Sequence, residues 1–168
     1  MVLKAQAQFG FLGSYNKAVG DPAFERFKLG GDGMQGFDFL QGSELIAMRG
    51  YSNSAVIPNG SNVRIAQQSG SPIFTKYMLE LRYPVIASQS ATAFLVAFAE
   101  GGNTWNKFSE YNPFNVRRSA GFGAKIFLPI FGLLGIDYAI PFDKIPGVEN
   151  GGKQNFTFSI AQQLGGFN

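Results

Sequence analysis

Arg49 is the residue of this sequence best placed to do specific chemistry, and that chemistry is ion pairing. Alternation within residues 92–104 places Glu100 on a strand face that also carries Phe94, Val96 and Phe98. A charge held away from water is costly unless it is paired. The planar fork of an arginine can satisfy both oxygens of a carboxylate. We therefore predict that Arg49 pairs with Glu100.

Two glycines give this pair the space that it needs. Gly50 lets the chain turn sharply after Arg49, and Gly102 leaves room on the strand for the backbone of an approaching loop. We therefore predict that the tip Arg49-Gly50-Tyr51 folds back onto the strand and that the ion pair with Glu100 holds it there.

Other kinds of chemistry have little support. The 168 residues contain no Cys and no His, which removes the usual zinc ligands and the usual nucleophile–base pairs. We expect no enzyme activity, no cofactor and no metal site. The net charge of +3 comes from scattered Lys and Arg residues rather than from a basic run. We therefore expect no nucleic-acid partner.

Alternating apolar and polar residues predict six β-strands and an all-β, antiparallel fold. The predicted strands are residues 2–14, 73–84, 92–104, 117–128, 133–142 and 154–164. These lengths exceed those of most soluble strands and match what a tilted strand needs to cross a bilayer. The best candidate for a spanning helix, residues 126–136, is too short and contains Pro and Gly. The pattern favours a transmembrane β-barrel.

The residue types on the two strand faces support the membrane assignment. The polar faces are rich in Gly, Ser and Ala, which suits a barrel lumen. Aromatic residues near the predicted strand ends suit the membrane interfaces, and they are Tyr77, Tyr83, Trp105, Tyr138 and Phe142. A soluble lipocalin-like barrel shows the same alternation with inside and outside exchanged, so it stays open as an alternative.

Residues 15–72 form an unusually long connection between the first two predicted strands. Loops of such length are functional or disordered, and the aromatic content argues against disorder. Alternation in residues 37–40 and 44–48 predicts a small hairpin inside the connection. Short connections at one end of the strands and long ones at the other match the layout of outer-membrane barrels.

The order of these motifs resembles that of BamA-type outer-membrane barrels. That family carries a Gly-Gly turn, then an Arg-Gly-aromatic loop tip that folds into the barrel, then a Phe-x-Asp/Glu-x-Gly motif two strands later. The matching positions here are Gly30 and Gly31, the tip Arg49-Gly50-Tyr51, and Phe98-Ala-Glu-Gly-Gly102. Residues 79–84, 118–123 and 135–142 also look like strands of the family, and residues 156–163 look like its terminal strand. Leu164 stands where the family usually ends on an aromatic residue.

The resemblance implies that residues 1–168 are one C-terminal segment of a sixteen-stranded barrel in the bacterial outer membrane. The complete protein would carry POTRA domains and upstream barrel strands and would insert nascent outer-membrane proteins without ATP. Assembly-complex lipoproteins and the lipid bilayer would be its other partners. Its lateral seam would include four residues of the terminal strand, Phe156, Phe158, Ile160 and Leu164, and Asp137 would be a polar residue of the lumen.

Six strands are too few to close a barrel in lipid, since single-chain bacterial barrels begin at about eight. The N-terminus also lacks the pattern of a signal peptide. We therefore expect this chain to be part of a longer protein. Two alternatives stay open besides insertion: a two-partner-secretion or translocation member of the same superfamily, and a passive structural barrel or porin.

Overall fold

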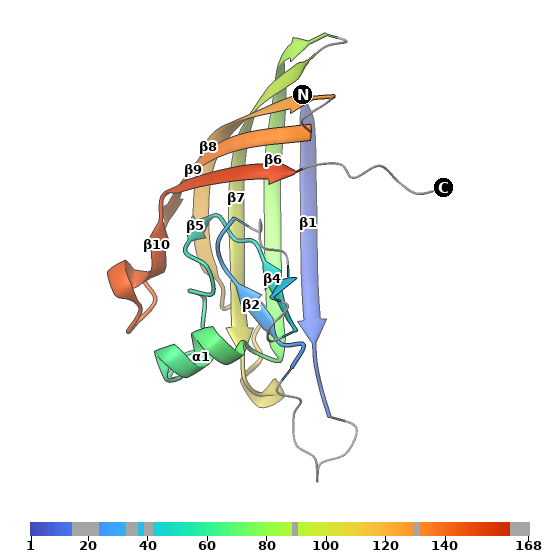
Figure 1. The fold of residues 1–168 in the computed structure, drawn as a ribbon. Helices are drawn as coiled ribbons and strands as arrows, with labels where there is room; N and C mark the ends of the chain where they lie inside the picture. Colours follow the sequence, from blue (N-terminus) through green and yellow to red (C-terminus); the bar gives the residue numbers. More distant parts are fainter. Residues whose placement is uncertain (15–23, 33–36, 39–41, 89–90, 130–131, 162–168) are drawn as a thin grey trace.

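The main element of the computed structural model is a six-stranded antiparallel sheet in the order β1-β6-β7-β8-β9-β11. The structure describes residues 1–14, 24–32, 37–38, 42–88, 91–129 and 132–161. The strands of this sheet are β1 (Val2–Phe11), β6 (Ile73–Ala87), β7 (Thr92–Trp105), β8 (Arg117–Leu128), β9 (Gly132–Pro141) and β11 (Phe156–Ala161). Figure 1 shows that the sheet is strongly curved. The predicted all-β, antiparallel fold is confirmed.

The connection between β1 and β6 contains most of the smaller elements. They are β2 (Phe27–Leu29), β3 (Phe37–Asp38), β4 (Ser43–Ile46), β5 (Gly50–Tyr51) and the helix α1 (Val63–Ser69). Antiparallel pairing of β3 with β4 gives the predicted hairpin, whose residues 39–41 lie outside the described ranges. The 3₁₀ helices η1 (Phe108–Glu110) and η2 (Glu149–Gly152) and the strand β10 (Lys153–Gln154) lie in later connections. None of the helices in the described ranges is long and apolar enough to cross a membrane.

Two strands differ in length from the prediction, and a proline is involved in each case. β1 is shorter than predicted, and β6 is longer. β1 ends at Phe11 rather than at residue 14. The next residue, Leu12, lies opposite Pro72. Pro72 accepts a hydrogen bond from the amide of Leu12 but has no N–H to return, so the ladder ends. β6 continues beyond Pro84 to Ala87 because a bulge between Pro84 and Ile86 accommodates the proline.

The predicted last strand, residues 154–164, is wrong as a single element. The structure divides it into β10, which pairs with β5, and β11, which pairs with β9. Asn155 lies at the change of partner, where its side-chain amide donates to the carbonyl of Ala139 at 2.9 Å. The strand breaks because the folded-in connection offers β10 a second partner. Residues 162–164 lie outside the described ranges.

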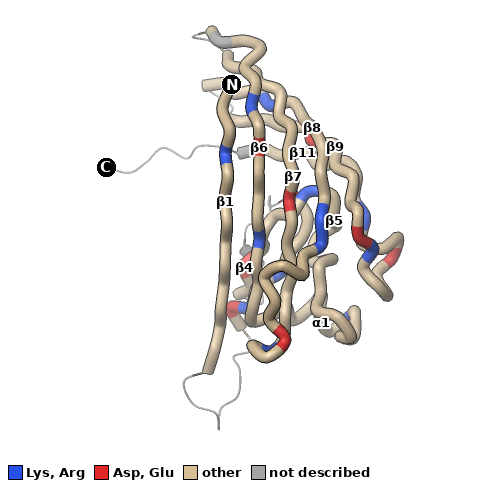
Figure 2. The backbone as a smooth tube through the Cα atoms, turned by 180° about the vertical axis from the view of Figure 1, so that it is seen from behind, with Lys and Arg blue, Asp and Glu red and all other residues tan. Residues whose placement is uncertain are grey.

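The two faces of the sheet differ in what covers them. The connection packs inside the curve, where its residues Leu29, Met48 and Tyr51 are at most 1% exposed (Figure 1). The outer face presents apolar side chains that are 38 to 64% exposed, namely Leu79, Leu81, Tyr83, Leu95, Phe122 and Ile136. Charged positions are spread thinly along the six strands (Figure 2). This is the arrangement of a barrel wall with a filled inner side and a lipid-facing outer side.

The connections also differ between the two ends of the sheet. Residues 12–72, 106–116 and 142–155 join strands at one end, whereas the short connections at residues 88–91 and 129–131 lie at the other. Trp105 lies at the end with the long connections, but it is only 5% exposed and packs edge-on against Tyr111. Its predicted place in an aromatic girdle is therefore wrong, because residues beyond the end of β7 cover it.

Candidate functional site

A pair of glycines sets the course of the connection before the tip. Gly30 and Gly31 have φ angles of 130° and 82°, which residues with a Cβ rarely adopt. A Cβ on Gly30 would lie 2.2 Å from the backbone oxygen of Ser52. The amide of Gly31 donates to the carbonyl of Tyr51 at 2.8 Å, and the Gly31 carbonyl accepts from the amide of Met48 at 3.1 Å. The glycine pair therefore holds both sides of the tip.

Gly50 lets the tip lie directly on the sheet. Its φ angle is 93°, and a Cβ there would lie 2.9 Å from the Cβ of Ser119 on β8. The hydroxyl group of Ser119 donates to the carbonyl of Arg49 at 2.6 Å. Directly after Arg49, β5 pairs with β10. The backbone of the tip is thus fixed to the inner face from two directions.

Arg49 and Glu100 lie together under the folded tip. The Nε and Nη2 atoms of Arg49 are 2.8 and 2.7 Å from Oε1 of Glu100, and the Arg49 amide donates to Oε2 at 2.9 Å. The guanidinium group thus contacts one carboxylate oxygen rather than both, because the backbone N–H occupies the other. Both residues are buried, at 8% and 5% exposure.

Phe98 supports the flat side of the arginine. The Cζ atom of Arg49 lies 3.5 Å from the centroid of the Phe98 ring, a cation–π contact that gains strength when it is shielded from water. The register pairs Phe98 with Gly121 on β8, where a Cβ would lie 2.8 Å from the tip of the ring. The Phe-x-Glu-x-Gly segment therefore provides both the stacking surface and the counter-charge.

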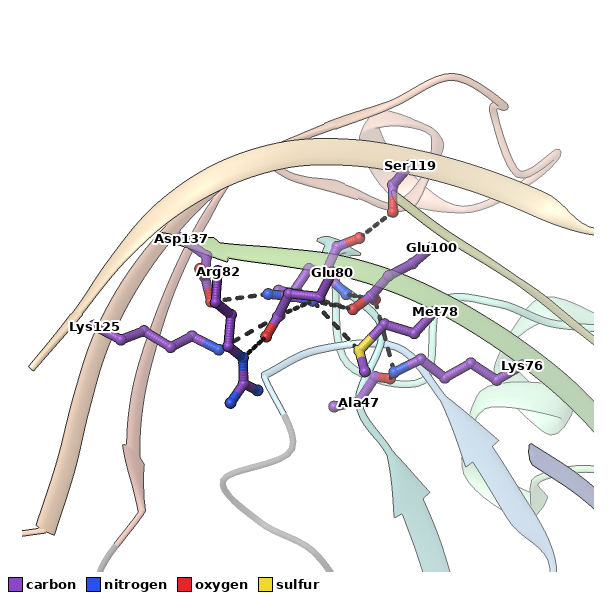
Figure 3. A network of polar contacts seen from close by, with 10 residues as sticks. Ala47, Lys76, Met78, Glu80, Arg82, Glu100, Ser119, Lys125 and Asp137 are labelled. Carbon is purple, nitrogen blue, oxygen red and sulfur yellow. Dashed lines mark hydrogen bonds and ion pairs between the residues drawn. The ribbon is translucent and has the colours of Figure 1, made fainter. Parts of the chain in front are cut away.

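Two more carboxylates, Glu80 and Asp137, share the same arginine. Figure 3 labels both of them, together with Glu100, in this network of polar contacts. Glu80 Oε2 lies 2.9 Å from Nη2 of Arg49, and Asp137 Oδ2 lies 3.6 Å from Nη1. Each carboxylate is 2% exposed. Asp137 was predicted only as a lumen residue, and Glu80 was not singled out. Alternation places both on the polar faces of their strands, but only the register of the folded sheet shows that they converge.

Arg82 and two lysines complete this charge cluster, and Arg82 Nε lies 2.7 Å from Glu80 Oε1. Lys76 Nζ lies 3.7 Å from Glu100 Oε2 and also donates to the carbonyl of Ala47. Lys125 Nζ lies 3.7 Å from Glu80 Oε2. Across the described part of the chain, no group of three or more acidic side chains has an arrangement that could hold a metal ion. These ion pairs can hold the loop tip at Arg49 in place on the sheet.

Gly102 provides the room that the sequence predicted for the loop. A Cβ there would lie 3.0 Å from Leu29 Cδ2 and 3.2 Å from Met48 Sδ. Both of those side chains are fully buried in the hydrophobic core between the connection and the sheet. The glycine therefore allows β7 and the connection to pack without a gap.

Tyr51 fastens the far side of the tip to the rim of the sheet. Its hydroxyl group lies 2.9 Å from the carbonyl oxygen of Arg118 and 3.1 Å from that of Asp143. The side chain is 1% exposed, and burial raises the pKa of Tyr51 to about 12. The tyrosine therefore stays neutral in the folded protein well above the pH at which an exposed tyrosine ionises.

This pKa predicts a loss of stability at high pH. Because the folded pKa of about 12 lies above the ordinary value of 10.0, the contribution of Tyr51 is complete below pH 10 and falls as the pH rises toward 12. The urea midpoint of the detergent-solubilised protein should fall more steeply across this window for wild type than for Tyr51→Phe. Parallel curves for the two proteins would contradict the assignment.

The residues predicted for a lateral seam lie on the outer face of an edge strand. Phe156, Phe158 and Ile160 are 68%, 49% and 46% exposed on β11. Among the described strands, β11 pairs only with β9, and β1 forms the opposite edge of the sheet. Leu164 lies outside the described residues.

Comparison with known proteins adds a family to this geometry. The Omp85 superfamily domain matches residues 1–164 of the chain. That range contains all six strands of the sheet, the long connection and every residue of the charge cluster. A search of curated proteins gave no match.

Proposed function

Because the chain belongs to the Omp85 superfamily, we propose that it is the C-terminal part of a BamA-type barrel that inserts nascent outer-membrane proteins. Members of this superfamily are outer-membrane proteins that insert or transport proteins and are not classical enzymes. In the proposal the complete protein is a bacterial sixteen-stranded barrel with POTRA domains, and assembly-complex lipoproteins assist it.

The observation that carries the proposal is the tip held inside the wall. Arg49 joins carboxylates from three neighbouring regions of the sheet, Glu80 on β6, Glu100 on β7 and Asp137 on β9. A passive barrel has no need for a loop fixed so tightly to its inner face. In an insertase, Arg49 and these three carboxylates would form a brace that keeps the central strands rigid while the sheet edge changes partners.

The proposed mechanism uses backbone hydrogen bonds and no covalent step. β11 has an unpaired edge among the described strands, and β-strand addition to such an edge is an established mode of recognition. A substrate strand would pair with this edge, and the exposed side chains of Phe156, Phe158 and Ile160 would face lipid beside it. Exchange of hydrogen bonds then releases the folded substrate into the bilayer.

Insertion by the full-length protein reconstituted in lipid vesicles tests the proposal. We expect an unfolded outer-membrane protein added from outside to become folded and heat-modifiable on a gel, faster than in empty vesicles. The wild-type rate should fall with the brace variant Arg49→Ala. Export of an unfolded protein to the vesicle interior would instead favour the secretion branch. Ion conductance with no effect on substrate folding would favour a passive barrel.

A further inference from the structure

A groove on the outer face of the sheet lies opposite the buried charge cluster. It has a volume of about 750 Å³ and runs along β7, where Ala99 is exposed and the side chain of Val116 covers Gly101. The register places Leu79 beside Ala99, and Tyr77 and Arg118 on either side of Gly101. On β8 the partner of Ala99 is Ala120, so two short side chains beside Leu79 leave the groove open.

Arg118 is an unusual residue for the outer face of a membrane-facing strand because it is charged. Its side chain is 64% exposed at the edge of the groove. Its Nε and Nη2 atoms each lie 3.1 Å from a carboxylate oxygen of Asp143. Nη1 has no hydrogen-bond partner within the described ranges. The guanidinium group is therefore held in place and still presents donors to a ligand.

The groove lies at the end of the sheet that carries the long connections. In outer-membrane barrels the long loops face the outside and the short turns face the periplasm. Exposed Phe142 also borders the groove, at 60% exposure, as expected near the lipid headgroups. Arg118 therefore sits at the headgroup level of the outer leaflet, and Ala99 lies deeper, at the level of the acyl chains.

We propose that this groove binds a phosphorylated lipid of the outer leaflet, with an acyl chain over Ala99 and the phosphate on Arg118. Basic side chains at headgroup level bind lipid phosphates, and the Nη1 atom of Arg118, which Asp143 does not contact, would donate to a phosphate oxygen. Tyr77 lines the groove from β6, on the other side of β7 from Arg118. The inference rests on the outer-membrane location of the family and not on the proposed insertase function.

Lipid binding to the full-length protein in detergent tests the inference. The probes are phosphatidic acid and diacylglycerol with the same acyl chains, and bound lipid is counted by native mass spectrometry. We expect retention of phosphatidic acid and little retention of diacylglycerol. Arg118→Gln should weaken the binding of phosphatidic acid roughly tenfold, because one charge-assisted contact is lost. Asp143→Asn should bind at least as well as wild type, because it frees the arginine.

A matched pair of substitutions on β7 separates the groove from the rest of the outer face. Ala99→Leu fills the groove and should abolish retention, whereas Ala93→Leu on the same face lies outside it and should not. Equal retention of both lipids, wild-type binding by Arg118→Gln, or equal loss from the two leucine variants would overturn the inference. Complete displacement by millimolar inorganic phosphate would also overturn it, because the site would then recognise phosphate alone.

Discussion

Replacing Arg49 with alanine is expected to destabilise the folded protein by about 3–5 kcal/mol, the usual cost of removing one partner from a buried ion pair. The substitution leaves Glu80, Glu100 and Asp137 buried without the cation that they share. It also removes the group that covers the ring of Phe98. The loss should appear as a lower temperature for the heat-induced mobility shift on a gel, and as slower barrel assembly.

Arg118→Ala is the matched control for the Arg49 prediction. Arg118 is also an arginine bonded to a carboxylate through two of its nitrogens, but its side chain is 64% exposed. Exposed ion pairs contribute little to stability, so this variant should shift at nearly the wild-type temperature. If the two alanine variants lowered the shift temperature equally, burial would not explain the contribution of Arg49 to stability.

Two further variants identify which property of Arg49 matters. Arg49→Lys keeps the charge but lacks the fork that reaches Glu100 and Glu80 together, and it loses the flat stacking on Phe98. It should therefore recover only part of the loss. Arg49→Ala combined with Glu100→Gln should be less destabilised than the sum of the two single variants, because the glutamine removes the unpaired charge. An exactly additive double variant would argue that the two side chains are not coupled.

The pairing of Arg49 with Glu100 could be predicted from the sequence because both residues lie in short, ordered motifs. Alternation fixes the face of Glu100, and the cost of an unpaired charge requires a cation. The resemblance to the motif order of BamA-type barrels then indicates that Arg49 is this cation. The other members of the cluster could not be predicted, because their distances depend on register. Lys76 and Glu80 lie on β6 and Asp137 lies on β9, and only the successive pairing of β6, β7, β8 and β9 brings them together.

The C-terminal strand shows the same limit. Residues 154–164 alternate as one strand, and alternation contains no information about which neighbour each half contacts. β5 takes β10 as its partner only after the tip has folded back, so the break at Asn155 is a consequence of tertiary structure. Trp105 was misplaced for a related reason, since its cover comes from Tyr111 beyond the end of its own strand.

Replacing Gly121 with alanine is expected to destabilise the protein by about 1–3 kcal/mol through overpacking. A Cβ there would lie 2.0 Å from the carbonyl oxygen of Tyr138 and 2.8 Å from the tip of the Phe98 ring. The carbonyl belongs to the backbone of β9, so β8 and β9 must separate locally. Gly13→Ala is the control, because a Cβ at Gly13 has nothing within 4 Å and should leave the shift temperature unchanged.

Gly121→Ala can act by displacing Phe98 or by separating β8 from β9, and combining it with Arg49→Ala distinguishes these two effects. If the new methyl group displaces Phe98, the arginine loses its stacking surface, and part of its contribution is already gone before Arg49 is removed. The combined loss should then be smaller than the sum of the single losses, as expected for residues that share a partner. Additive losses would confine the damage to the contact between β8 and β9. Because Phe98 contacts both Gly121 and Arg49, we expect the double variant to lose less stability than the sum of the two single variants.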